Sequence, residues 1–136
     1  MKRLHVSIRV QDLNASVRFY TAFFDAEPTL LKDDYAKWIL DDPRVNFVIE
    51  PGTDKMGVDH LGIQAETEAE LEDISARLAV AEFETMDQKD AICCYSKADK
   101  YWTRDPQGLA WETFYTFGTS TTYGKDTLKA LERQGF

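Results

Sequence analysis

Two similar stretches, LHVSIRVQDLNASVRFY at residues 4–20 and DHLGIQAETEAELEDISARL at residues 59–78, decide the predicted fold. Each begins with apolar and polar residues in alternation, which is typical of a half-buried strand, and continues with apolar residues at helical spacing. The only two histidines of the chain, His5 and His60, occupy matching points of the two stretches. The repeat therefore predicts a duplicated module in which each copy contributes one imidazole to a shared centre.

Both halves of the chain continue in the same order, with several strands after the helix. Asp12 or Asn14 can cap the first helix, and Thr67 followed by Glu70 indicates a capping box at the second. The strand candidates after the two helices cover residues 27–31, 35–40 and 45–50 in the first half and 83–87, 91–95, 101–104 and 109–117 in the second. We therefore expect an α+β fold of two tandem βαβββ modules, whose sheets curl around a shared metal-binding cleft.

The length of the chain limits its domain organisation. With 136 residues it can bury one core but is too short for two independent domains of ordinary size. We expect a single domain over residues 1–136, with module one at about 1–52 and module two at about 57–117. The remaining C-terminal tail, residues 118–136, is predicted to end in a short helix at 125–133.

Charge and hydropathy exclude several classes of partner. The formal net charge is -8 and the pI is near 4.7, which disfavours binding to nucleic acid or an anionic membrane surface. The N-terminal stretch MKRLHVSIRV lacks the apolar segment of a signal peptide, and no apolar stretch approaches the roughly 20 residues that cross a bilayer. We therefore expect a cytoplasmic protein, monomeric or homodimeric, that acts on a small molecule.

The two histidines and one late carboxylate form a candidate metal site. Glu112 lies in the strand-like run Ala110–Phe114, where an unpaired carboxylate would be costly and coordination would relieve that cost. Two imidazoles and one carboxylate leave positions open for substrate and oxygen on a non-haem ferrous ion, so we place iron ahead of zinc. The alternative is that both histidines have ordinary structural roles and that Glu112 faces water.

The adjacent pair Cys93 and Cys94 is the second candidate feature. Neighbouring thiols do not easily form an unstrained disulfide, and in a regular strand their side chains would point apart. A turn at this place would let both sulfurs face one soft electrophile, with Lys89, Lys97 and Lys100 nearby to hold a thiolate. The alternative is that one cysteine is simply packed inside and the other is incidental.

Several segments resemble a known family. DHLGIQ at the start of the second half and RDPQGLAWETF at its end are similar to the vicinal oxygen chelate superfamily of glyoxalases, bleomycin-resistance proteins and extradiol dioxygenases. DDYAKWILDDPRVNFVIE, CCYSKADKYW and TFGTSTTYG more narrowly resemble the cadmium-induced protein and organoarsenical carbon-arsenic lyase group. The resemblance covers the chain up to about Gly124, and the CCY segment is its most specific part.

This resemblance implies a function and a set of site residues. It implies cleavage of the carbon-arsenic bond of trivalent organoarsenicals, such as methylarsenite or aromatic arsenicals, with Fe(II) as cofactor, O2 as co-substrate and arsenite as product. His5, His60 and Glu112 fall on the iron positions, and Cys93 and Cys94 fall on the positions that bind the substrate arsenic. In the same resemblance, Tyr95, Lys100 and Tyr101 lie beside them as supporting groups.

Two further functions stay open from the sequence. The chain could bind cadmium or arsenite through its cysteines without catalysis. It could also be an extradiol dioxygenase or a glyoxalase-like enzyme on another substrate, since these share the expected fold and do not need adjacent thiols. Fold analogy alone does not decide among the three.

Overall fold

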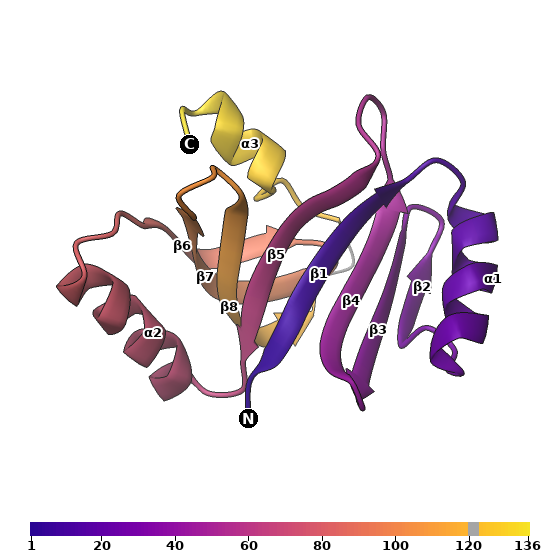
Figure 1. The fold of residues 1–136 in the computed structure, drawn as a ribbon, viewed down its shortest axis with the longest axis horizontal. Helices are drawn as coiled ribbons and strands as arrows, with labels where there is room; N and C mark the ends of the chain where they lie inside the picture. The colour runs from indigo at the N-terminus through magenta and orange to yellow at the C-terminus, as the bar shows by residue number, and fades with distance from the viewer. Residues whose placement is uncertain (120–122) are drawn as a thin grey trace. The chain divides into compact units, whose positions relative to one another are not determined.

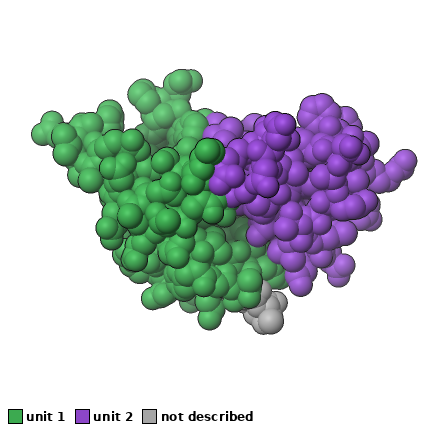
Figure 2. All heavy atoms as spheres, turned by 90° about the horizontal axis from the view of Figure 1, so that it is seen from below, with its two compact units in different colours: residues 1–2, 63–136 green, residues 3–62 purple. Residues whose placement is uncertain are grey.

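The computed structural model describes residues 1–119 and 123–136, so positions 120–122 of the TFGTSTTYG ending and of the tail lie outside the described residues. The chain has two compact units, which Figure 2 distinguishes by colour. Unit 1 comprises residues 1–2 and 63–136, and unit 2 comprises residues 3–62. That residues 1–136 form a single domain stays a prediction.

The elements follow one another in the order βαβββ, βαβββ and a final helix (Figure 1). They are β1 (Arg3–Val10), α1 (Leu13–Phe24), β2 (Leu30–Lys32), β3 (Tyr35–Asp41), β4 (Arg44–Pro51), β5 (Gly57–Ala65), α2 (Glu68–Val80), β6 (Met86–Cys93), β7 (Ser96–Arg104), β8 (Ala110–Thr119) and α3 (Leu128–Arg133). The α+β class and the two tandem βαβββ modules are therefore confirmed. Among the described residues, no helix is long and apolar enough to cross a membrane.

Unit 2 holds the first module and the beginning of β5. Its strands have the order β2-β3-β4-β1-β5, and β1 runs parallel to β4 while β3 runs antiparallel to β4. The core includes buried Trp38, Phe47 and Ile49, against which the partly buried side of α1 packs. Asp12 caps α1, because its Oδ1 accepts the backbone N–H of Ala15 at 3.0 Å. The parallel pairing places β1 and β4 in fixed register.

Unit 1 holds the remaining strands and two helices. Strand β7 pairs with β6 on one side and with β8 on the other, both antiparallel. Helix α2 buries Leu71 in a small core that includes Ala65 and Tyr101, while α3 buries Leu128 and Leu131 in a core that includes Trp102 and Ala110. Thr67 caps α2 as predicted, since its Oγ1 accepts the N–H of Glu70 at 3.1 Å. Both helices thus contact β7, α2 at Tyr101 and α3 at Trp102.

The segment before β7 differs from the prediction. The sequence predicts two strands here, at residues 83–87 and 91–95, but a single strand, β6, runs from Met86 to Cys93. The pairing of β6 with β7 shifts between Gln88 and Ala91, where Asp90 has a φ of 51°. A residue with positive φ at a bulge interrupts the alternation of side chains without ending the strand, which explains the wrong prediction.

Candidate metal and thiol site

The two histidines lie on neighbouring strands of unit 2, His5 on β1 and His60 on β5. Both are largely buried, and their Nε2 atoms lie 3.1 Å apart. Two ligands that share one ion at metal–nitrogen distances of about 2.1 Å, at a right angle, are about 3 Å apart. The spacing of the two imidazole nitrogens therefore fits a pair of ligands on one ion.

The other nitrogen of each imidazole is held by oxygen atoms. His5 Nδ1 lies 3.2 Å from the backbone oxygen of Asn46 and 3.0 Å from its Oδ1. His60 Nδ1 lies 2.7 Å from Asp59 Oδ2. Because these oxygens accept hydrogen bonds, they favour a proton on each Nδ1 and leave a lone pair on each Nε2. Two such lone pairs facing each other repel unless a cation or a proton lies between them, so the imidazole pair fits a metal.

Asp59 is itself held in place by charge. Arg9 Nε lies 3.6 Å from Asp59 Oδ1, and Arg9 Nη2 lies 3.4 Å from Oε1 of the buried Glu50. Burial acts to raise the pKa of the Asp59 carboxyl, but its hydrogen bond and charge interaction with His60 and the charge of Arg9 outweigh burial and lower that pKa. Asp59 therefore stays a carboxylate, which can accept a hydrogen bond from the Nδ1–H of His60.

Glu112 is the third residue of β8, in unit 1, and only 7% of it is exposed. Its Oε2 accepts a hydrogen bond from Lys100 Nζ at 2.9 Å, and the lysine is equally buried. From the sequence, coordination of a metal is expected to relieve the cost of burying this carboxylate, but Lys100 already provides an opposite charge. A carboxylate has two oxygens and can accept from a lysine with one while it coordinates a cation with the other.

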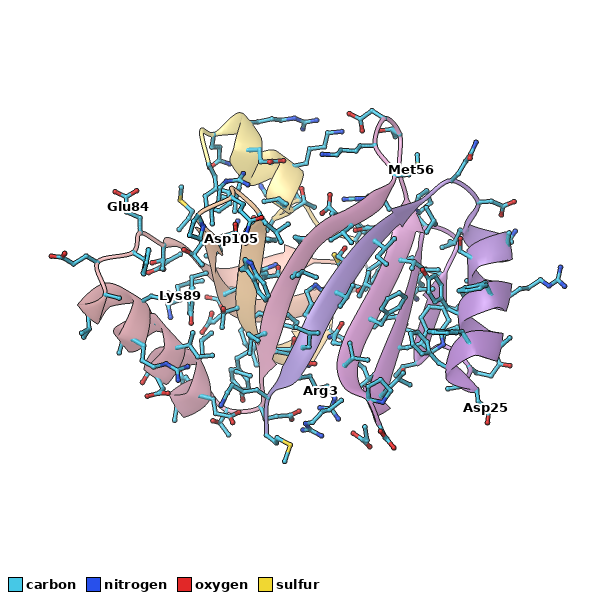
Figure 3. All side chains as sticks on the ribbon, viewed as in Figure 1. Arg3, Asp25, Met56, Glu84, Lys89 and Asp105 are labelled. Carbon is cyan, nitrogen blue, oxygen red and sulfur yellow. The ribbon has the colours of Figure 1, made fainter. Side chains whose placement is uncertain are left out.

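Lys100 also interacts electrostatically with the two cysteines. Burial acts to lower the pKa of the Lys100 ammonium, but the charge of Glu112 and then the charges of the Cys93 and Cys94 sulfurs outweigh burial and raise that pKa above its ordinary value. Lys89 and Lys97 are exposed, and Lys89 is labelled in Figure 3. Of the three lysines that the sequence suggested, Lys100 thus joins the carboxylate and the thiols in one electrostatic group.

The cysteines lie at the hairpin between β6 and β7. Cys93 is the last residue of β6 and is paired with Ser96, so Cys94 and Tyr95 form a two-residue turn. Both turn residues have positive φ, 59° and 65°, as a type I′ hairpin turn requires. The two sulfurs lie 2.7 Å apart. The turn that would let both thiols face one electrophile is therefore present.

The two tyrosines named with the site have different surroundings. The ring of Tyr95 lies 5.8 Å from that of Tyr123 in an edge-to-face arrangement. Tyr101 is buried under α2, and its hydroxyl donates to the backbone oxygen of Leu71 at 3.2 Å. Tyr95 thus flanks the thiol turn, whereas Tyr101 contacts the α2 side of unit 1.

Three residues beside the candidate site, Asn46, Asp59 and Asp126, were not among those predicted from the sequence. The first two could have been found, because Asn46 lies opposite His5 in the β1–β4 pairing and Asp59 directly precedes His60. Asp126 accepts the N–H of Ile92 at 2.8 Å, close to the thiol turn, although the two residues are 34 positions apart. No local pattern in the sequence predicts that contact.

Comparison with known proteins identifies the family. The model of the Glyoxalase/Bleomycin resistance protein/Dioxygenase superfamily matches residues 2–113, and the chain therefore belongs to this superfamily. An extradiol ring-cleaving dioxygenase from B. fuscum has a similar structure, with a TM-score of 0.63 and 16% identity over 97% of this chain and 35% of that chain. At this identity the likeness shows the fold alone.

Two relatives are much closer in sequence. A trivalent organoarsenical cleaving enzyme from Bacillus sp. (strain MD1) is 40% identical over 121 residues, which are 85% of this chain and 74% of that protein. The cadmium-induced protein CadI of Mycobacterium bovis is 32% identical over 126 residues, which are 91% of this chain and 82% of that protein. The resemblance inferred from the sequence motifs is confirmed, and these relatives indicate an enzyme of the superfamily.

Proposed function

We propose that this protein cleaves the carbon-arsenic bond of trivalent organoarsenicals, such as methylarsenite or aromatic arsenicals, and releases arsenite in a reaction that requires Fe(II) and O2. The observation that carries this proposal is the pair of sulfurs 2.7 Å apart on the β6–β7 turn. Other chemistries of the superfamily, such as ring cleavage, have no need of adjacent thiols. The name of the Bacillus relative supports the same substrate class.

Capture of the substrate is assigned to Cys93 and Cys94. Trivalent arsenic is a soft centre, and thiolate is the side-chain ligand that soft centres prefer. Two sulfurs on one turn bind a single arsenic atom at both sides, which fixes the direction of the remaining carbon-arsenic bond. Holding that bond in one orientation turns the reaction into a positioned, effectively unimolecular event.

The metal is assigned to His5, His60 and Glu112. The donor set of two imidazoles and one carboxylate is the one that non-haem ferrous oxygenases use, and bound ferrous iron would supply the activation of oxygen. Asn46 and Asp59 contact the Nδ1 atoms of the two imidazoles and hold the rings with their Nε2 atoms facing each other, where both would be available to bind an ion. Lys100 donates a hydrogen bond to one oxygen of Glu112 and interacts electrostatically with Cys93 and Cys94.

The test is an arsenite-release assay after anaerobic reconstitution. Protein loaded with Fe(II) is mixed with methylarsenite and then exposed to air, and arsenite is measured against protein kept anaerobic. We expect many turnovers that depend on both iron and oxygen. Glu112→Ala should lose iron but keep thiol capture, whereas the control Glu132→Ala, on an exposed carboxylate of α3, should retain both. No arsenite release from iron-loaded wild-type protein in air would refute the proposal.

The close pair of sulfurs also fits a second function, the binding of a soft metal without catalysis. Vicinal thiols can bind cadmium or arsenite without further chemistry, and one relative is named for its induction by cadmium. In that case the double variant Cys93→Ala/Cys94→Ala would lose binding, and wild-type protein would bind its ligand stoichiometrically without forming product. The expected cytoplasmic location and the monomeric or homodimeric state stay predictions.

A further inference from the structure

A segment of the C-terminal tail runs along the thiol turn. We call residues Tyr123–Asp126 the strap. Gly124 forms an isolated antiparallel bridge with Cys93, and the backbone N–H of Cys94 donates to the oxygen of Tyr123 at 2.6 Å. Hydrogen bonds between Asp126 and Ile92 extend this contact by one residue along β6. The backbone of Cys94 is therefore hydrogen-bonded to the strap, and Cys93 lies opposite Gly124 in the bridge.

Asp126 binds Ile92 in two ways. Its backbone N–H donates to the oxygen of Ile92 at 3.2 Å, and its Oδ2 accepts the N–H of Ile92 at 2.8 Å. Both polar backbone groups of Ile92, the residue before the thiol pair, are thus satisfied by one aspartate. A side-chain acceptor of this kind fixes the end of β6 where its regular pairing stops.

Gly124 is the point of closest approach. Its φ is +86°, which side chains rarely tolerate, and a Cβ at this position would lie 2.1 Å from the oxygen and 2.5 Å from the carbonyl carbon of Ile92. These are rigid backbone atoms, so a methyl group would force the strap and β6 apart. Gly108 provides a matched comparison, because its φ is +87° and a Cβ there would meet nothing within 4 Å.

The far end of the strap is anchored by α3. Thr127 caps this helix, and Leu128 and Leu131 are buried in a core that includes Trp102 and Ala110. Trp102 lies on β7 and Ala110 on β8, the strands that carry Lys100 and Glu112. The anchor therefore fixes the strap to the same strands as the buried ion pair.

The thiol turn needs such support, because two consecutive non-glycine residues with positive φ are an unfavourable choice for a hairpin turn. We propose that the strap is the positioning element of the thiol pair: it holds Cys93 and Cys94 in the turn in which both sulfurs bind one trivalent arsenic. This rests on the proposed function and gives the tail after Gly124 a role in that site. Gly124 and Asp126 act through the cysteines and do not touch substrate.

The test measures thiol capture with phenylarsine oxide, separately from turnover. In this reaction two S–H bonds and the arsenic–oxygen bond break, two arsenic–sulfur bonds form and water leaves, while arsenic stays trivalent. Binding is titrated by the loss of two titratable thiols per arsenic in wild type, Gly124→Ala and Gly108→Ala. We expect Gly124→Ala to bind at least about tenfold more weakly than Gly108→Ala, because a displacement of about 1 Å is enough for such losses.

A second pair of variants tests the strap if Gly124→Ala does not fold. Asp126→Ala removes the acceptor of the Ile92 N–H and should weaken capture severalfold, whereas Asp126→Asn keeps a carbonyl oxygen and should restore it. Binding of Co(II), a probe of the histidines, should be unchanged in all these variants. Equal capture by Gly124→Ala and Gly108→Ala, or by Asp126→Ala and wild type, would overturn the inference. Failure of arsenite release with intact capture would instead refute only the proposed function.

Discussion

The buried pair of Lys100 and Glu112 yields the sharpest prediction about stability. In Lys100→Met the side chain keeps a similar apolar length, but Glu112 loses the ammonium that lies 2.9 Å from its Oε2. Only 5% of the lysine side chain and 9% of the glutamate side chain are exposed, so water does little to screen the pair. The carboxylate would then have to be buried without its partner or be expelled.

The size of the stability loss follows from this burial. Removing one partner of a buried ion pair destabilises a protein by about 3–5 kcal/mol, whereas replacing both partners with apolar residues is close to neutral. For a chain of this length, a loss of 3 kcal/mol lowers the Tm by roughly 10 °C. Lys100→Met should therefore be strongly destabilised, and Lys100→Met/Glu112→Leu should recover most of the loss.

The assay is thermal and urea unfolding of metal-free protein, with Lys97→Met on the same strand as the control. Lys97 is exposed, and its variant should differ from wild type by less than about 0.5 kcal/mol. Added Co(II) should stabilise Lys100→Met, because bound metal would neutralise the unpaired Glu112 carboxylate. Two results would show that the ion pair does not stabilise the fold as proposed. One is that Lys100→Met is as stable as Lys97→Met. The other is that the losses in unfolding free energy of Lys100→Met and Glu112→Leu simply add in the double variant.

Two further predictions concern the groups around the site. In Asn46→Ala, His5 Nδ1 keeps only the backbone oxygen of residue 46 as a partner, so Co(II) binding measured by equilibrium dialysis should weaken about tenfold. Asn46→Asp, which keeps a side-chain oxygen, should bind Co(II) about as tightly as wild type. Equal Co(II) affinities of Asn46→Ala and wild type would contradict the role assigned to Asn46. Asp105 accepts hydrogen bonds from the backbone N–H groups of Gln107 and Leu109 in the turn before β8. Burial acts to raise the pKa of Asp105, but these hydrogen bonds and those with Trp111 and Gly108 lower it. The stabilisation of the folded protein by the Asp105 carboxylate is therefore present above the ordinary pKa of an aspartate and is lost as the pH falls. The Tm difference between wild type and Asp105→Ala should shrink from pH 7 to pH 3. An unchanged Tm difference would contradict this.

Local patterns in the sequence predicted most of the framework. Alternation in β1 and β5 and helical spacing in α1 and α2 identified these elements, because each has one face in a core. The same repeat pairs His5 with His60, and their Nε2 atoms lie 3.1 Å apart. Periodicity thus predicts that two residues lie close together when they occupy equivalent points of two copies of one module.

Turn conformations and contacts between residues far apart in the sequence could not be predicted from periodicity. The positive φ values at Cys94 and Tyr95 run against the preferences of these residues, and the strap at Gly124 comes from a part of the tail with no readable pattern. The ion pair of Lys100 with Glu112 depends on the register of β7 and β8. Turn geometry and strand register are set by tertiary packing, which a single sequence does not display.

The most direct test of the account is a calorimetric titration of Co(II) into wild type, His60→Ala, Glu112→Ala, Glu132→Ala and Cys93→Ala/Cys94→Ala. We predict one ion per chain in wild type, in Glu132→Ala and in the double cysteine variant, and no binding at the same concentrations in His60→Ala and Glu112→Ala. Wild-type affinity in Glu112→Ala would contradict the claim that two imidazoles and this carboxylate hold one metal.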